Sequence, residues 1–154
     1  MKIATTKESC FATLKCEHFP DNELHPLHSS LSSQYYAEYY LSNHSTKFED
    51  VSCIVFDDNR VYCLIGLTIS VNENNNIPEL GFYGLPAYYQ EHGELSLSCK
   101  KRIQKLLDKY IQNIITCASV KKINFLNTQS YLSPMALILL KYQCNASINF
   151  LQNI

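Results

Sequence analysis

The side chains best able to hold a metal or to activate a nucleophile are spread thinly along this chain. His18, His25 and His28 come closest to a cluster, and the spacing of the last two could bring a pair of ligands together. Pro26 lies between those two and works against a helix, and no neighbouring residue completes the three or four ligands that a metal site needs. We therefore expect no metal site here and interpret these histidines as exposed loop residues.

The seven cysteines are equally dispersed. They include no Cys-x-x-Cys pair, which leaves a structural zinc site without support, and no serine or cysteine stands in a nucleophile-elbow glycine pattern. A phosphate-binding loop ending in Lys-Ser/Thr is also missing from the sequence. Several cysteines lie inside apolar runs, where they act as small buried hydrophobes in a reducing compartment, so we expect a cytoplasmic location.

The composition is that of an ordinary globular protein. The 154 residues predict a single domain spanning 1–154, and 46% hydrophobic with 18% charged residues is too apolar for a disordered chain. With 13 basic and 14 acidic residues the net charge is −1, so the basic excess of a nucleic-acid-binding protein is lacking. We find neither a secretory signal nor an apolar run of about 18 residues and expect no membrane span.

The elements that must position any site are centred on a β-meander. Two apolar stretches, Val51–Phe56 and Val61–Val71, flank the turn sequence Asp57–Arg60. Because both stretches are apolar on both faces, we expect them to be central strands. A polar tip at Asn72–Asn76, expected to be mobile, leads to a third strand over Glu79–Pro86.

Helices and further strands are expected around this meander. Residues 1–28 are interpreted as an irregular segment with at most a short strand at Phe11–Leu14, followed by a serine-capped helix over Ser29–Asn43. A long amphipathic helix is predicted over Ser96–Ala118. A strand at Ile123–Asn127, a helix at Met135–Tyr142 and a strand at Ala146–Leu151 complete the order. The predicted fold class is α+β, with a mixed, mainly antiparallel central sheet and helices on both faces.

Tyrosine is the most conspicuous aromatic residue, with eleven copies. Tyr35, Tyr36, Tyr39 and Tyr40 recur at helical spacing within the predicted Ser29–Asn43 helix. Such a stripe either packs into the core with its hydroxyls at the edge or lines a substrate cleft. We favour core packing.

Three short stretches carry a resemblance to a known family. They are Ser32-Ser33-Gln34-Tyr35-Tyr36 at the start of a helix, the Phe56–Arg60 hairpin, and Leu80–Pro86. Together with the order of elements, they resemble the GNAT acetyltransferase superfamily. More narrowly, they look like the amino-terminal half of the Fem-type peptidoglycan aminoacyltransferases. The resemblance implies transfer of an acyl or aminoacyl group to an amine of a sugar or peptide precursor.

The same resemblance implies acetyl-CoA or a related acyl-CoA as cofactor. In GNAT proteins a Gln/Arg-x-x-Gly-x-Gly/Ala turn before the long helix binds the pyrophosphate through amide groups and the helix dipole. The counterpart here is Gln90-x-x-Gly93-x-Leu95, in which bulky Leu95 departs from the pattern. Tyr83 and Gly84 are further candidates for cofactor binding.

Acyl transfer to an amine requires a base for the ammonium and an acid for the leaving group. Under the resemblance, Glu79 and His92 are the candidate catalytic bases and Tyr142 is the candidate acid. Glu91 and Glu94 are further candidate bases, and Tyr131 is a further candidate acid. The two additional glutamates would also bring unfavourable negative charge to the proposed pyrophosphate turn.

Two other functions stay open at this point. In Fem-type enzymes two GNAT-like halves share one chain, so the resemblance allows a second GNAT-like half as partner. A non-catalytic module of the same fold could instead use a tyrosine-lined groove beside Phe82-Tyr83-Gly84 to bind a ligand or subunit. An α+β dimerisation domain could pair two copies through the edge of the last strand.

Overall fold

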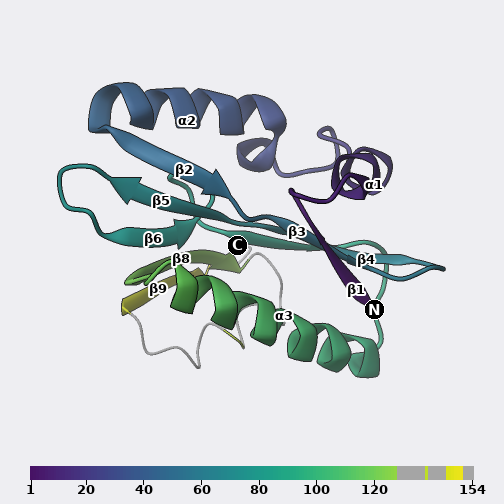
Figure 1. Cartoon of the computed structure of the whole chain (residues 1–154). Helices are drawn as coiled ribbons and strands as arrows, with labels where there is room; N and C mark the ends of the chain where they lie inside the picture. The colour runs from purple at the N-terminus through teal and green to yellow at the C-terminus, as the bar shows by residue number, and fades with distance from the viewer. Residues whose placement is uncertain (128–137, 139–144, 151–154) are drawn as a thin grey trace.

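The protein is an α+β structure in which helices cover both sides of two neighbouring β-sheets (Figure 1). The computed structural model describes residues 1–127, 138 and 145–150. In chain order the elements are β1 (Lys2–Thr5), α1 (Cys10–His18), the short 3-10 helix η1 (Pro26–His28), α2 (Ser30–His44), β2 (Thr46–Asp50), β3 (Cys53–Phe56), β4 (Val61–Gly66), β5 (Thr68–Asn72), β6 (Pro78–Gly81), β7 (Tyr88–Glu91), α3 (Leu97–Cys117), β8 (Lys122–Asn127) and β9 (Asn145–Phe150).

The meander is built from three long chain segments that each pass from one sheet to the other. The four-stranded sheet has the order β1-β3-β4-β7, and the five-stranded sheet has the order β2-β5-β6-β8-β9. Thus β2 leads into β3, β4 into β5, and β6 into β7. All pairings are antiparallel except β6 with β8 and β8 with β9, which are parallel. The α+β class and the mainly antiparallel pairing are confirmed, while the single sheet expected from the sequence is divided in two.

The division between the sheets arises where Leu67 interrupts the predicted strand Val61–Val71. Opposite it, Val51 and Ser52 separate β2 from β3. The Ser52 hydroxyl donates to the Leu67 carbonyl oxygen at 3.2 Å and accepts from the Leu67 amide at 3.0 Å. The Val51 amide donates to the same carbonyl at 2.9 Å. A side chain therefore replaces part of the ladder, and the buried backbone groups stay paired.

Helix α3 covers one side of the sheets with an apolar stripe (Figure 1). Its residues Ile103, Leu107 and Ile111 are fully buried and recur every four positions, which places them on one helix face. Ser96 caps the helix by accepting a hydrogen bond from the Cys99 amide at 3.3 Å. The predicted long amphipathic helix is confirmed to within one residue at each end.

Helices α1 and α2 lie on the opposite side (Figure 1). Phe11 of α1 belongs to a second buried cluster with Phe19, Ile54 and Leu64. The expectation that residues 1–28 are irregular is wrong, because they contain β1, which pairs with β3, and α1. The proposed strand at Phe11–Leu14 lies within this helix. Only one residue of α1 is buried, so the sequence has no apolar stripe that would predict the helix.

Helix α2 begins after Ser29, whose hydroxyl accepts from the Ser32 amide at 3.2 Å. Its predicted extent is close to the observed one, but the predicted burial of its tyrosines is wrong. No residue of α2 is buried, and Tyr35 and Tyr39 are 61% and 43% exposed. Tyr40 lies against Gly84, where the ring leaves no space for a Cβ atom.

Both predicted turns of the meander form through Asp and Asn side chains. Asp57 Oδ1 accepts from the amides of Asn59 and Arg60, each at 3.1 Å. In the tip that was expected to be mobile, Asn72 Oδ1 accepts from the Asn74 amide at 2.8 Å. The tip is therefore a hydrogen-bonded turn of the kind that Asn residues favour.

The last described elements agree with the predicted strands. β8 and β9 begin one residue before the predicted Ile123–Asn127 and Ala146–Leu151. The helix predicted over Met135–Tyr142 lies outside the described residues. Within the part of the chain that the structure describes, no helix is both long and apolar enough to cross a membrane.

Candidate functional site

A cavity of about 340 Å³ lies between α1, α2 and the place where the two sheets part. We call it the Asp50 cavity. Its polar lining includes Lys15, Ser30, Ser33, Gln34, Asp50 and Ser52. Tyr83 and Tyr88 complete the polar wall, while the apolar lining includes Leu64 and Phe82. The volume suits a small polar molecule.

Asp50 is the acidic group of this cavity, and it stands at the end of β2. Its Oδ1 accepts from the Ser52 amide at 2.9 Å, and its Oδ2 accepts from the Tyr83 hydroxyl at 3.0 Å. A carboxylate offers about four lone-pair sites. Asp50 is therefore oriented by the protein and still has capacity to accept hydrogen bonds from a ligand.

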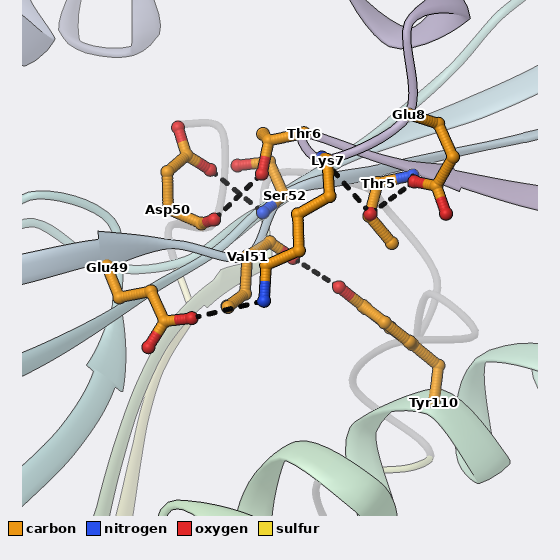
Figure 2. A network of polar contacts seen from close by, with 9 residues as sticks. All are labelled: Thr5, Thr6, Lys7, Glu8, Glu49, Asp50, Val51, Ser52 and Tyr110. Atoms are coloured by element: carbon orange, nitrogen blue, oxygen red, sulfur yellow. Dashed lines mark hydrogen bonds and ion pairs between the residues drawn. The ribbon is translucent and has the colours of Figure 1, made fainter.

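The backbone beneath Asp50 is held from the other side of the sheets. Figure 2 shows Tyr110 of α3 reaching the junction between β2 and β3, where its hydroxyl donates to the Val51 carbonyl at 2.8 Å. In the same view the Asp50 carboxylate points away from Tyr110. The Thr6 hydroxyl donates to the Asp50 carbonyl at 2.9 Å. These two hydrogen bonds hold the backbone of Asp50 and Val51, which forms the floor of the cavity, in a fixed position.

Tyr83 reaches Asp50 from a tight turn between β6 and β7. The Phe82 and Leu85 backbones exchange two hydrogen bonds, of 2.6 and 2.9 Å, and the two residues between them have positive φ. Gly84 adopts φ 79° without strain, whereas φ 48° is uncommon for a bulky residue such as Tyr83. The Tyr83 amide donates to the Thr68 hydroxyl at 2.8 Å. Burial, and next the Asp50 charge, raise the pKa of Tyr83, so its hydroxyl remains a donor.

Tyr88 is a deeply buried residue of the cavity wall, at the same 4% exposure as Ser52. Its ring is stacked on His28 with centroids 3.8 Å apart and planes 7° from parallel. Gly66 also lies against this ring and leaves no space there for a Cβ atom. Within the described residues no group hydrogen-bonds to its hydroxyl. Burial, followed by the charges of Asp50 and Asp21, raises the pKa of Tyr88, so this hydroxyl stays protonated.

Two of the three histidines depart from the expectation of exposed loop residues, whereas His25 is exposed as expected. His28 is buried, at 4% exposure, and burial lowers its pKa to about 4, with His25 as the smaller cause. It therefore serves as a neutral aromatic partner of Tyr88. His18 lies in α1 with its ring 4.9 Å from that of His92. Among the described residues, no group of three His, Cys, Asp or Glu side chains could hold a metal ion.

The three residues of the predicted pyrophosphate motif do not all lie in the turn before α3. Gln90 lies within β7, paired with Leu64, so it precedes the turn. Gly93 is in the turn and has φ 71°. Leu95, which departs from the motif, is buried in the core beside α3. Its bulk therefore points inward and leaves the outer face of the turn open.

Arg60 braces this turn from the β3–β4 hairpin. Its Nη2 donates to the carbonyl oxygens of Glu94 at 2.8 Å and His92 at 3.4 Å. A Cβ built on Gly93 would meet only this guanidinium, at 3.4 Å. The negative charge of Glu91 is paired with Lys100 at 3.2 Å. The turn thus has a cation beside an open glycine, a feature that the motif alone did not indicate.

The predicted catalytic residues do not come together. Glu79 is paired with Lys122 at 3.4 Å and lines a separate hollow of about 310 Å³ together with Gly84. His92 follows the last residue of β7, and its ring meets the Phe19 ring edge-on with the two centroids 5.6 Å apart. Tyr142 lies outside the described residues, as does Tyr131. Tyr83 lines the Asp50 cavity, in contact with Asp50.

Sequence reasoning missed Asp50, Tyr88, Ser52 and Lys15. The first of these lies in β2, which the sequence did not predict, and its partner Tyr83 is 33 positions away. The sequence did contain one indication of this site, the polar residues Asp50 and Ser52 next to a strand of apolar residues. Polar groups beside a buried strand need hydrogen-bond partners, which marks them as candidates. Comparison with protein-family models, with curated proteins and with solved structures gives no match.

Proposed function

We propose that this chain is a GNAT-like or Fem-like acyltransferase. It transfers an acyl or aminoacyl group to an amine of a sugar or peptide precursor, and the amine binds in the Asp50 cavity. In this reaction the amine nitrogen forms an amide bond with the carbonyl carbon of a thioester. The carbon–sulfur bond breaks, and the proton lost by the amine balances the thiol that is released.

The observation that carries the proposal is the pairing of Asp50 with an available hydroxyl in one cavity. An ammonium group has three donors and no acceptor, so its site must supply acceptors and negative charge. Asp50 provides both, and it is held in place by Ser52 and Tyr83. The Tyr88 hydroxyl, also on the cavity wall, can accept or donate a further hydrogen bond.

The order of the elements supports the proposed relationship to the GNAT fold. A helix precedes the meander, a long helix follows it, and the strand after that helix, β8, lies parallel to β6. This is the order on which the resemblance of the sequence rests. Fold analogy alone does not establish a reaction.

The residues of the turn before α3 fit the proposed acyl-CoA donor. Gly93 keeps the backbone open on its outer face, and Arg60 supplies the positive charge of a guanidinium beside it. The start of α3 adds the partial positive charge of a helix amino terminus. These groups would hold the pyrophosphate, and the bound acyl-CoA would supply the activated acyl group.

A non-catalytic binding module of the same fold would use the same cavity. It differs from the enzyme in one measurable property, the release of a thiol when an amine is present. Both functions predict that Asp50 contributes to ligand binding. Only the acyltransferase predicts that acetyl-CoA is consumed.

The test is thiol release from acetyl-CoA in the presence of a panel of primary amines. We expect amine-dependent release by the wild-type chain and at least a tenfold loss in Asp50→Asn, which retains the shape of the side chain but removes its charge. Asp58→Asn is the matched control, since Asp58 is exposed on the hairpin and paired with Lys2. No amine-dependent release, together with no heat on titration with millimolar acetyl-CoA, would remove the proposal for this chain.

A further inference from the structure

The Asp50 cavity contains charges of both signs, contributed by different elements. Asp50 comes from β2, and Lys15 comes from α1. Both side chains are partly buried, so interactions with them are less screened than at an open surface. A ligand with a single charge would satisfy one of these groups and leave the other facing it without compensation.

A second hollow, of about 460 Å³, adjoins the cavity on the side of α1. Phe11, Lys15 and Ser30 line both spaces, so the two hollows meet at these residues. The outer hollow has largely apolar walls that include Ala12 and Pro20, with Asp21 as its acidic residue. Lys15 therefore stands between a polar inner space and a largely apolar outer one.

The inner cavity holds the negative charge of Asp50, and the outer hollow holds that of Asp21 at its edge. The Asp21 carboxylate is already hydrogen-bonded, because it accepts from the Ser30 amide at 3.1 Å and the Ser30 hydroxyl at 3.0 Å. Burial is the largest cause that raises the pKa of Tyr88, and the charges of Asp50 and Asp21 are the smaller ones. An ammonium is therefore favoured at Asp50 on the inner wall, and a carboxylate is favoured at Lys15.

We propose that the acceptor bound here is an α-amino acid with an apolar side chain. Its ammonium binds Asp50, its carboxylate binds Lys15, and its side chain occupies the outer hollow. This inference rests on the proposed function, within which it selects the peptide-precursor class over amino sugars. Each charged group of the amino acid then lies next to a side chain of opposite charge in the cavity.

Three compounds of the same carbon skeleton test this assignment by titration calorimetry. They are L-leucine, L-leucinamide, which lacks the carboxylate, and 4-methylpentanoate, which lacks the ammonium. We expect L-leucine to bind about tenfold more tightly than either of the others, because each of these loses one charge-assisted contact.

Two variants assign the contacts to the two residues. Lys15→Gln should bring the affinity for L-leucine down to that for L-leucinamide and leave L-leucinamide unchanged. Asp50→Asn should weaken both amines and leave 4-methylpentanoate unchanged. Lys2→Gln, in the edge strand β1 where Lys2 pairs with Asp58 and lines neither hollow, should change none of the three. Lys15→Arg keeps the charge and should retain the preference for L-leucine. This control shows whether a change in Lys15→Gln comes from the lost charge or from unfolding of the protein.

The outcomes separate this inference from the proposed function. Equal binding of L-leucine and L-leucinamide by the wild-type chain would overturn the amino-acid assignment and leave an amine site in place. Equal binding of L-leucine and 4-methylpentanoate would overturn both, since no ammonium site would then exist. Absence of binding by either amine would also overturn both.

Discussion

The Tyr83 hydroxyl donates to Asp50 Oδ2 at 3.0 Å and joins the turn after β6 to the end of β2. This contact links a residue of positive φ to the acidic group of the cavity. Backbone strain of this kind persists where surrounding contacts hold it and is concentrated at functional sites. The turn and the carboxylate are therefore parts of one arrangement.

Tyr83→Phe removes that contact and leaves the ring in place. We expect the free energy of unfolding to fall by about 1 kcal/mol, because Asp50 loses a partly buried hydrogen bond. Urea denaturation at neutral pH measures this change. Tyr39→Phe is the control, since Tyr39 is exposed on α2, and it should leave stability within about 0.5 kcal/mol of wild type. Equal effects of the two changes would show that the contact with Asp50 contributes nothing.

Ser52→Ala tests how the junction between the sheets is held. The change removes the hydroxyl that accepts from the buried Leu67 amide, and an unsatisfied buried donor costs about 1–3 kcal/mol. Urea denaturation should show this loss, and hydrogen exchange of the Leu67 amide should become faster. Ser70→Ala removes only a longer hydrogen bond, of 3.4 Å to the Glu79 carbonyl, and should have a smaller effect. A Leu67 amide that exchanges as slowly as in wild type would contradict the assignment.

Gly66→Ala tests the position of Tyr88 between β4 and His28. A Cβ atom at this position would overlap the Tyr88 ring, so we expect a loss of about 1–3 kcal/mol in stability. In a Tyr88→Ala background the same methyl group has space, and the loss should largely disappear. Additive effects in this double-mutant cycle would show that the ring does not lie against Gly66.

His28 predicts a specific pH dependence of stability. Its pKa is about 4 in the folded protein, against an ordinary value of 6.5, so the unfolded chain binds a proton more readily. The contribution of His28 to the free energy of unfolding is therefore fully present above pH 6.5. It falls as the pH decreases toward 4, by at most about 3 kcal/mol. His28→Phe retains a ring beside Tyr88 and should remove this part of the dependence. His25→Asn, at an exposed position, should retain most of it. Parallel pH profiles for wild type and His28→Phe would contradict the account.

Gly93→Asp tests the proposed pyrophosphate turn. We expect it to abolish acetyl-CoA binding in calorimetric titration, because a carboxylate would meet Arg60 and repel the anion. Gly93→Asn has nearly the same size and tolerates positive φ equally well, so it controls for bulk and strain. It should retain more affinity than the aspartate variant. Unchanged affinity in Gly93→Asp would exclude the turn as the donor site.

Much of the fold could be predicted from local patterns. The β3–β4 hairpin and α3 each combine an apolar run or stripe with turn or cap chemistry, and these signals agree with one another. By contrast, β1 is four residues long and α1 buries a single side chain, so neither leaves a periodic signal. The break at Leu67 was missed because the hydroxyl of Ser52, in the link between β2 and β3, replaces the ladder there.

The site could be predicted only in part, since it depends on contacts between distant segments. The turn at Gly93 was found through a local pattern, whereas the brace from Arg60 lies 34 positions from Glu94. Asp50 gains its role from Tyr83, and Tyr88 gains its position from His28 and Gly66. Glu79 had the right chemistry for a base, but its partner is Lys122, in a different hollow.

Binding of an amine beside Asp50 is most directly observed through the tyrosine rings. Protein labelled on its tyrosines is titrated with L-leucinamide and followed by NMR, with assignments from single Tyr→Phe variants. We predict that the signals of Tyr83 and Tyr88 shift on binding, while those of Tyr35 and Tyr39, exposed on α2, stay in place. Unchanged Tyr83 and Tyr88 signals at saturating amine, or shifts confined to α2, would contradict the placement of the acceptor in the Asp50 cavity.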